Sequence, residues 1–467
     1  MQNEIKVEFD EFGFARYISD YKTAAQRKQE GKDIRLKFPR ETHSEFDLAG
    51  DCRDPVSVIK KSSENRIEHL IPIRYGRMAK NFFTFYRGTA SLMANDLAET
   101  PVSGIRVQAC GDCHLSNFGL FATPERNLIF DINDFDETLP APFEWDVKRL
   151  AASFYIAALN NRFADKDCAA ASRNCVRAYR EAIAKFSLMK VLDVWYSKLD
   201  MEKIIASAPD AEAKRNRELI ANEARSNVTE YVFPKIAKVQ GDRRRIVDQV
   251  PLVYHPKNDE LVYESLTETI GMYRETLPHE RRVLLDRYHI EDIAYKVVGV
   301  GSVGTRCGVV LLLAEQNDPL LLQLKEARPS VLEPYAGKSE FSQHGQRIVV
   351  GQRLMQSASD MMLGWVTGRK GVDFYIRQLR DMKYSLDIDK LIQKQLSRYA
   401  EICGWTLARA HARSGDASTI YGYLGKSDEF DRAVGTFSKA YADQTKHDYK
   451  IFVEAIKSGE ITAKKGV

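Results

Sequence analysis

The spacing of hydrophobic and polar residues changes along this chain at about residue 290. Before this point most apolar residues recur at helical spacing, as in residues 145–158, and long helical segments follow. After it, residues 295–300 are rich in β-branched side chains, and residues 307–313 and 320–325 form two further apolar runs separated by turn residues. The pattern predicts a large, mainly helical body followed by a small unit built from strands.

The strand-rich unit is predicted to contain three strands, a helix and two more strands. The helix covers residues 339–357, and the last two strands fall at residues 362–366 and 374–379. Helical spacing returns from residue 388 to residue 413. The fold class predicted from these patterns is α+β, with a small antiparallel sheet beside a larger helical part.

Candidate chemistry concentrates in residues 110–146. Residues 105–109 alternate between apolar and polar, which predicts a short strand that ends beside Gly111 and Asp112. The apolar run at residues 128–132 predicts a second strand that returns to the same region. It brings back a group of carboxylates, those of Asp131, Asp134, Asp136 and Glu137. Such an arrangement is common in sites for a metal ion and a phosphate, and the alternative is an acidic surface turn.

Composition narrows the possible partners and compartment. The chain is 44% hydrophobic and 29% charged, a balance typical of globular proteins, and its 69 basic and 65 acidic residues give no support for nucleic-acid binding. The N-terminus lacks the apolar segment of a secretory signal, and no run approaches the ~20 apolar residues of a membrane helix. Seven cysteines, an odd number, fit reduced thiols. We therefore expect a cytoplasmic protein with no nucleic-acid or membrane partner.

Gly299, Gly301 and Gly304 form a G-x-G-x-x-G pattern that serves two unrelated nucleotide-binding designs. A dinucleotide-binding fold needs a helix directly after the glycines and a carboxylate ~20 residues on. Here the following segment is strand-like, and the residue 21 positions after Gly304 is Lys325. This favours a glycine-rich hairpin over a triphosphate, with Ser302 in the loop and Lys325 pointing into the cleft. The alternative for Lys325 is an exposed strand lysine.

Asp112 and Asn117 have the spacing of a phosphotransfer loop. They are five positions apart, as in loops where an aspartate takes the proton of the attacking hydroxyl and an asparagine holds a metal ion. Asp134 lies 22 positions after Asp112, where a further Mg²⁺ ligand is expected. Asp136 is an additional candidate for a metal contact.

Residues 110–114 also match C-x-x-C-H, the signature of covalent haem attachment and of a redox pair. Haem attachment of this type needs an exported chain, which the N-terminus does not predict. A zinc site lacks a second cysteine pair. His114 is therefore interpreted as a hydrogen-bonding organiser of the loop.

Two arginines, Arg77 and Arg87, lie among the aromatic residues of residues 74–98. Two interpretations stay open for them. Their stems can cover aromatic faces, or their guanidinium groups can contact a phosphate.

The segments GDCHLSNFG, NDFDE and FEWDVKRLA resemble the catalytic and metal-binding segments of small-molecule kinases of the aminoglycoside- and choline-kinase type. The resemblance implies that Asp112 is the catalytic-loop aspartate and that Asn117 and Asp134 bind the metal ion. It also implies that Asp146 is a structural aspartate of the following helix. Cys110 stands where those kinases usually have histidine, a departure that bears on the orientation of the loop.

More closely, the chain resembles a bacterial family classified as a domain of unknown function, from about residue 38 to about residue 440. The motifs that carry this resemblance are RYGRMA, FYRG, GDCHLSNFG, NDFDETLPAPFEWDVKRLAAS, VGVGSVGT, LQLKEA, GQRLMQ and ARAHARSGD. It implies a kinase-like fold and gives no substrate.

The order of the segments departs from that of ordinary kinases, because Asp112 and Asp134 precede Gly299. A circular permutation reconciles the parts, and it is tolerable where the original termini lie close together. The implied fold is bilobal. Its parts are an N-terminal extension (residues 1–70), a large lobe with the catalytic and metal-binding loops (71–290), a glycine-loop lobe (291–382) and helices that return to the large lobe (383–467).

Two consequences of the permuted arrangement concern single elements. The helix over residues 396–412 is expected to pack near the catalytic loop. The carboxylate that fixes Lys325 is predicted to be Glu340, near the start of the helix over residues 339–357, in preference to Glu333, which precedes Pro334.

The sequence thus predicts a phosphotransferase that depends on ATP and Mg²⁺ and acts on an acceptor the sequence does not identify, small molecules included. The residues expected to bind the nucleotide are Gly299, Gly301, Ser302, Gly304, Lys325 and Glu340. Two alternatives stay open: a nucleotide-binding pseudokinase that acts as a scaffold, and a nucleotidyl transferase that moves AMP.

Overall fold

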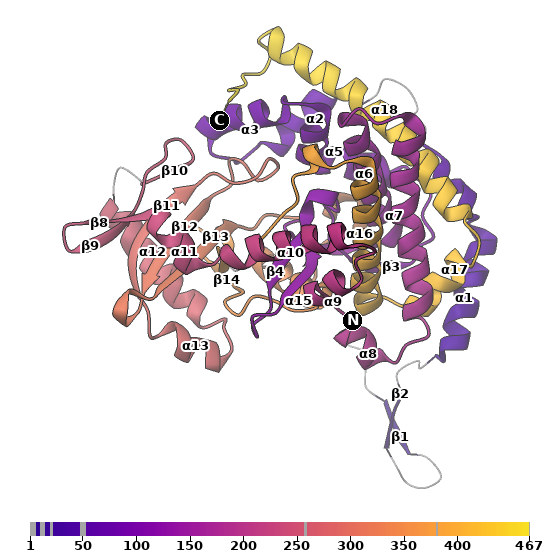
Figure 1. Ribbon diagram of the computed structural model, residues 1–467, viewed down its shortest axis with the longest axis horizontal. Helices are drawn as coiled ribbons and strands as arrows, with labels where there is room; N and C mark the ends of the chain where they lie inside the picture. The colour runs from indigo at the N-terminus through magenta and orange to yellow at the C-terminus, as the bar shows by residue number, and fades with distance from the viewer. Residues whose placement is uncertain are drawn as a thin grey trace.

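The structure is a computed structural model that describes residues 6–9, 15–18, 22–46, 53–255, 259–379 and 382–466. A six-stranded antiparallel sheet stands beside a larger, mainly helical body (Figure 1). The predicted α+β fold class is therefore confirmed. Of the predicted N-terminal extension, residues 1–5, 10–14, 19–21 and 47–52 lie outside the described residues.

The five predicted strands belong to the six-stranded sheet, and the predicted helix follows the third of them in the chain; the sixth strand, β10 (Val253–Tyr254), was not predicted. β11 (His289–Lys296) starts earlier than predicted and ends sooner, so that residues 297–306, with all three glycines, form a loop. α15 (His344–Met355) starts later than predicted, because the side chain of Gln343 caps it by accepting a hydrogen bond from the Gln346 amide. The sheet order is β10, β11, β12 (Cys307–Leu313), β13 (Pro319–Glu326), β15 (Asp373–Gln378) and β14 (Gly364–Thr367).

Both faces of this sheet are covered. Leu322 and Leu324 of β13 pack in the apolar cluster under α12 (Asp259–Arg274) and α13 (His279–Leu285), which contains Tyr273 and Leu285. Leu321 points to the opposite cluster, with Phe233 of α11 (Thr229–Ile236) and the hairpin of β8 (Ala237–Gln240) and β9 (Arg243–Ile246). The predicted alternation along β13 is confirmed, and it turns Lys325 to the same side as Leu321.

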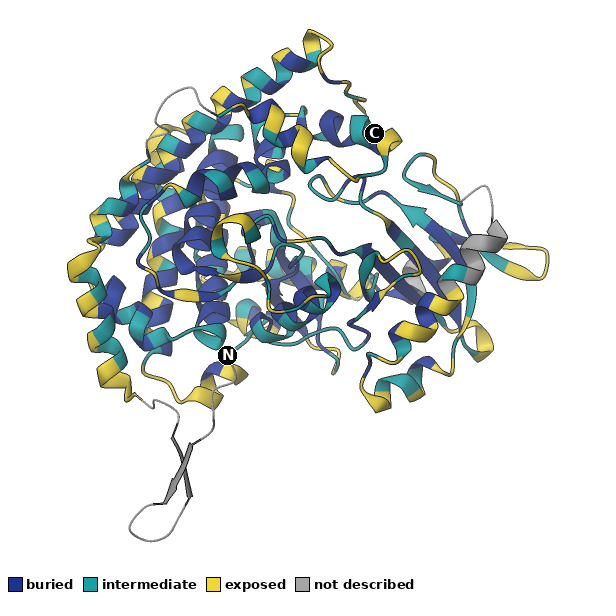
Figure 2. Ribbon diagram, turned by 180° about the vertical axis from the view of Figure 1, so that it is seen from behind, coloured by how far each residue is buried: buried dark blue, intermediate teal, exposed yellow. Residues whose placement is uncertain are grey.

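The helical body is organised around α6 (Phe143–Asn160), in which every residue from 143 to 158 is buried. α6 packs against α7 (Asp165–Phe186), α16 (Gln393–Ser414) and α18 (Glu429–Lys457). Dark blue ribbon marks this buried centre in Figure 2, with the exposed side of α18 on the outside. The helices predicted over residues 145–158 and 388–413 are confirmed, although residues 388–390 form a separate 3₁₀ turn, η5 (Ile388–Lys390).

A close contact between α7 and α16 depends on Gly404. A Cβ atom at this position would lie 2.2 Å from the carbonyl oxygen of Cys175. We expect Gly404→Ala to lower the free energy of unfolding by about 1–3 kcal/mol through overpacking. Gly271→Ala is the matched control, because Gly271 also lies in a helix but no atom of the described residues comes within 4 Å of its Cβ position. Urea denaturation should show no loss for this control; equal losses for both variants would contradict the packing argument.

The remaining elements surround this framework. Part of the predicted N-terminal extension is helical, and α1 (Ala24–Lys37) packs against α17 (Ala417–Leu424), where Gly31 and Gly422 approach closely. Two small sheets lie in the body: β3 (Arg106–Ala109) with β6 (Leu139–Pro142), and β4 (Phe118–Ala122) with β5 (Leu128–Ile132) and β7 (Leu199–Asp200). The other elements are β1 (Lys6–Phe9), β2 (Ala15–Ile18), η1 (Arg40–Ser44), α2 (Pro55–Ser62), η2 (Glu68–Leu70), α3 (Ile71–Met78), α4 (Phe82–Gly88), α5 (Ala90–Ala98), η3 (Leu115–Asn117), α8 (Val191–Tyr196), α9 (Met201–Ala206), α10 (Ala211–Ser226), η4 (Glu315–Asn317) and α14 (Glu333–Ala336).

Among the described residues, none of the helices combines the length and the apolar character that crossing a membrane requires.

Candidate functional site

The loop after β3 is held by Asp146 of α6. The Asp146 carboxylate accepts hydrogen bonds from the backbone amides of Cys110 (2.7 Å) and Gly111 (3.0 Å). Nε2 of His411, from α16, lies 3.3 Å from the same carboxylate. Gly111 has a φ of +81°, and a Cβ atom there would lie 2.3 Å from the Glu137 carbonyl oxygen, so the turn requires glycine. Asp146 therefore supports the loop, and Asp112 follows directly at its tip.

Asp112 uses one of its carboxylate oxygens for an ion pair. Oδ1 accepts from Nε of Arg149 at 2.7 Å and also contacts Nη2 of that buried side chain. Oδ2 makes no hydrogen bond within the described residues and lies 3.8 Å from Nε2 of His114. Burial, together with the charges of Arg87 and Arg149, holds the pKa of His114 well below its usual range, so this imidazole is neutral. Oδ2 of Asp112 thus stays available to a ligand.

Asn117 and Asp134 lie together at the open end of the β4–β5 hairpin. The Asn133 amide donates to the Asn117 carbonyl at 2.9 Å, and Asp134 is the next residue. Nδ2 of Asn117 donates to the Asp112 carbonyl at 2.8 Å, which leaves Oδ1 of Asn117 without a hydrogen bond from the described residues. Burial and the charge of Asp136 raise the pKa of Asp134. A cation between the Asn117 and Asp134 oxygens would relieve this cost.

Lys325 is paired with Asp136 and not with the predicted Glu340. Its Nζ lies 2.7 Å from Oδ2 of Asp136, and the Tyr375 hydroxyl donates to Oδ1 at 2.6 Å. Burial alone would raise the pKa of Asp136, but the Lys325 charge outweighs it and holds that pKa below its usual value. Glu340 is exposed and precedes α15, so the predicted partner of Lys325 is wrong. Because both Asp136 oxygens are engaged, Asp136 serves Lys325 here and does not offer a free metal ligand.

The two other carboxylates of the predicted acidic cluster have structural partners. Asp131 is buried and pairs with Arg409 of α16, and its second oxygen accepts from the amide of Ser357 at 2.9 Å and from the hydroxyl at 2.7 Å. Glu137 accepts from the Val331 amide at 2.7 Å, and burial raises its pKa to about 7. Asp134 is therefore the member of the cluster that remains open to a cation.

Hydrogen bonds hold the glycine loop between β11 and β12 against the helical body. Arg77 donates to the Gly299 carbonyl at 2.6 Å, and the Ile67 amide donates to the Gly304 carbonyl at 2.8 Å. Arg66 donates to the Val303 carbonyl at 2.7 Å. Gly299 and Gly304 have φ angles of +70° and +89°, which explains why glycine occupies both positions. Arg77 thus binds loop backbone, a role that neither interpretation of the sequence included.

A cavity of about 310 Å³ is lined by three of the residues predicted to bind the nucleotide, Gly299, Ser302 and Lys325. Its basic side chains come from the sheet and from the segment after it, and Asp134 is the carboxylate among its lining residues. The lining residues are Asp134, Lys296, Val298, Gly299, Ser302, Gln323, Lys325, Arg377, Leu379, Lys383 and Ser385. Gly301 and Gly304 shape the loop without lining the cavity. Asp112 lies one loop away and is linked to Asp134 through Asn117.

Sequence reasoning missed three contributors to this region. Arg377 and Lys383 line the cavity but lie after the helix that was predicted to carry the partner of Lys325. Arg149 could have been found, since it follows Asp146 by three positions on one helix and so points the same way.

α16 packs against the loop that carries Asp112 and Asn117, as predicted. The hydroxyl of Tyr399 donates to the carbonyl oxygens of Leu115 (2.8 Å) and Phe118 (3.2 Å). These two carbonyls flank Asn117. The helix therefore fixes the segment that carries the candidate metal ligand.

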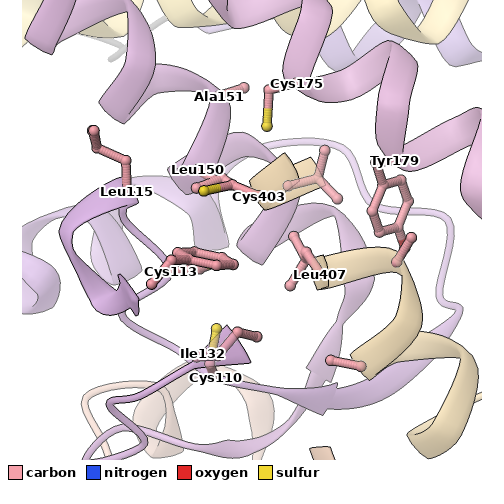
Figure 3. Packing of buried hydrophobic residues seen from close by; sticks show 14 of the residues in the cluster. Cys110, Cys113, Leu115, Ile132, Leu150, Ala151, Cys175, Tyr179, Cys403 and Leu407 are labelled. Atoms are coloured by element: carbon pink, nitrogen blue, oxygen red, sulfur yellow. The ribbon is translucent and has the colours of Figure 1, made fainter. Parts of the chain in front are cut away.

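The cysteines of the C-x-x-C-H sequence belong to the core. Cys110 and Cys113 are buried among apolar residues that include Leu150 and Leu407 (Figure 3). With Asp146 they form a group of three candidate metal ligands within the described residues. Burial raises the pKa of both thiols, that of Cys113 to about 11, and the Asp146 oxygens already bind backbone amides. Protonated, enclosed thiols fit packing and not zinc or haem binding.

These features define an α+β protein whose antiparallel sheet and helical body enclose a basic cavity beside a loop of carboxylates. Residues 66–455 match the family described as "Uncharacterized protein conserved in bacteria (DUF2252)", and the chain belongs to this family. Comparison with curated proteins gave no match, and neither did comparison with solved structures.

Proposed function

We propose that this protein is a phosphotransferase that uses ATP and Mg²⁺, with the segments of a kinase-like fold in permuted order. The observation that carries the proposal is the cavity shared by the glycine loop, Lys325 and Asp134. Four cationic side chains and one carboxylate line it, a charge balance suited to a polyphosphate with a metal ion.

The sheet side of the cavity supports binding of the nucleotide phosphates. Lys325 is buried and held by Asp136, so little side-chain entropy remains to be lost when it contacts a phosphate. Asp134 and Asp136 outweigh the effect of burial and keep the pKa of Lys325 well above its usual value, so the ammonium group is charged. Gly299 and Ser302 of the glycine loop line the cavity, as residues do in loops that cover a triphosphate.

The body side supports a metal ion. Oδ1 of Asn117 and the Asp134 carboxylate are the oxygens that would hold Mg²⁺, and their chemistry fits a hard cation. Bound there, Mg²⁺ would neutralise charge on the phosphate oxygens. Two observations support the fit: Oδ1 of Asn117 accepts no hydrogen bond from the described residues, and burial, followed by the charge of Asp136, raises the pKa of Asp134.

The position of Asp112 supports a role in activating the acceptor. Arg149 fixes the carboxylate through Oδ1, and the free Oδ2 can accept the proton of an attacking hydroxyl. In the transfer, a bond forms between the acceptor oxygen and the γ-phosphorus while the bond from that phosphorus to the ADP oxygen breaks. The acceptor proton goes to Asp112, and ADP leaves with the electron pair.

Two measurements test the proposal. Calorimetric titration should show binding of ATP that requires Mg²⁺, and absence of binding would overturn the proposal. Mass spectrometry after incubation with ATP and a bacterial small-molecule extract should detect a compound that has gained a phosphoryl group. A gain of AMP would indicate a nucleotidyl transferase, and binding with no product would indicate a nucleotide-binding scaffold.

Lys325→Met should weaken Mg·ATP binding by about 10–100-fold, because it removes a charge-assisted phosphate contact. Calorimetry measures the change. Lys338→Met is the matched control, since Lys338 is an exposed lysine of the same region, and its affinity should equal that of the parent.

The single variant leaves Asp136 without its partner, which can disturb the fold. The double variant Lys325→Met, Asp136→Asn removes this unpaired charge and should show the same loss of ATP affinity. Unchanged affinity in the double variant would exclude Lys325 from the nucleotide site.

A further inference from the structure

Arg87, at the end of α4, carries a guanidinium group that makes no hydrogen bond to any described residue. Its Nε atom is fully buried and has no hydrogen-bond partner among the residues that the structure describes. The charges of Asp112, Asp389 and Asp134 act on it, yet none of these carboxylates forms an ion pair with it in the described part of the chain. A cation held in a protein without a bonded partner is costly, so the arrangement points to an anionic ligand.

The backbone around Arg87 is fixed on both sides. Arg149, the partner of Asp112, donates to the Tyr86 carbonyl at 3.3 Å. Arg74 donates to the Gly88 carbonyl at 3.0 Å. The Tyr86 ring also lies under the Arg149 guanidinium, 4.6 Å from its centroid. Two buried arginines therefore hold the residues before and after Arg87, and its position is set by the framework that sets Asp112.

Arg87 also lies close to the glycine loop, beside Gly301. Its carbonyl oxygen would be 3.5 Å from a Cβ atom on Gly301. Arg87 thus lies near three parts of the proposed site: the glycine loop, Asp112 on the acceptor side and Asp134 on the metal side. In a phosphotransferase the group being transferred lies between these three parts.

We propose that Arg87 binds the terminal phosphoryl group of the nucleotide during its transfer. This inference rests on the function proposed above and adds a residue to it. The γ-phosphoryl oxygens would supply the anion that Arg87 lacks, and the guanidinium would stabilise their charge as the group moves from ADP to the acceptor. ADP lacks this group, so Arg87 should distinguish ATP from ADP.

The test compares nucleotide affinities of the full-length protein and its variants by calorimetry with Mg·ATP and Mg·ADP. Arg87→Gln should weaken ATP binding by about 10–100-fold while ADP binding changes less than about threefold. Arg87→Lys keeps the charge and should retain part of the preference for ATP. Arg77→Gln is the matched control: Arg77 holds the Gly299 carbonyl, so its loss should affect both nucleotides equally.

The outcomes separate this inference from the proposed function. If the parent binds ATP and Arg87→Gln loses ATP and ADP affinity equally, or loses neither, the role of Arg87 is wrong and the proposed function stands. If the parent binds neither nucleotide, both are wrong. Thermal unfolding gives an independent measure, because Arg87→Gln removes an unpaired cation and should unfold at the same or a higher temperature. A clear fall would mean that Arg87 supports the fold instead of binding a ligand.

Discussion

Asp112→Asn is expected to lower phosphoryl transfer by about 10²–10⁴-fold, the usual contribution of a positioned general base. The amide oxygen of asparagine can still accept from Arg149, but the side chain can no longer take a proton from the acceptor. Binding of Mg·ATP should stay close to that of the parent, because the Asp112 side chain lies outside the cavity that holds the phosphates. Transfer of label from γ-labelled ATP to water and to extract metabolites measures the loss.

Asp443→Asn makes the same chemical change at a carboxylate whose side chain is 64% exposed, and it should transfer label at the parental rate. Retained ATP affinity in Asp112→Asn would show that the variant is folded. A variant that binds ATP and transfers label as fast as the parent would remove Asp112 from the reaction.

Arg409→Met is expected to lower the free energy of unfolding by about 3–5 kcal/mol, because it leaves Asp131 as an uncompensated buried charge. Each side chain of this pair is only 1% exposed. Arg409 also donates to the Met355 carbonyl at 2.7 Å, so one change removes support from β5 and from the end of α15. Urea denaturation measures the loss.

The control is Arg177→Met. Arg177 pairs with Glu401, but these side chains are 45% and 44% exposed, so the expected loss is about 0–1 kcal/mol. The double variant Arg409→Met, Asp131→Asn keeps an acceptor for Ser357 without a buried charge. It should be more stable than Arg409→Met alone, and an equal or greater loss would contradict the buried-charge explanation.

Local patterns along the chain predicted five strands of the six-stranded sheet and one side of the candidate site. Alternation along residues 320–325 predicted that Lys325 points away from Leu320, Leu322 and Leu324. The spacing of Asp112, Asn117 and Asp134 identified residues that lie close together: the hairpin β4–β5 brings Asp134 beside Asn117, and the Asn117 side chain donates to the Asp112 carbonyl. Both predictions depend on periodicity and on residues that are near one another in the sequence, and such local patterns can be read from one sequence alone.

The partner of Lys325 could not be found in the same way. Asp136 lies 189 positions earlier in the chain, and no local signal links the two. The sequence favours Glu340 because it predicts a helix that begins at residue 339, whereas the cap at Gln343 delays the start of the helix to His344. The fastening of the glycine loop by Arg77 was missed for a similar reason, since these residues are 222 positions apart.

The support that α16 gives to the loop has a consequence for the order in which the protein can fold during synthesis. Tyr399, whose hydroxyl holds the Leu115 carbonyl, leaves the ribosome 284 residues after Leu115. All six strands of the large sheet are synthesised between Leu115 and Tyr399. The sheet thus separates two parts of the helical body along the chain. The body therefore reaches its final packing last, after the sheet, although its first helices are made early.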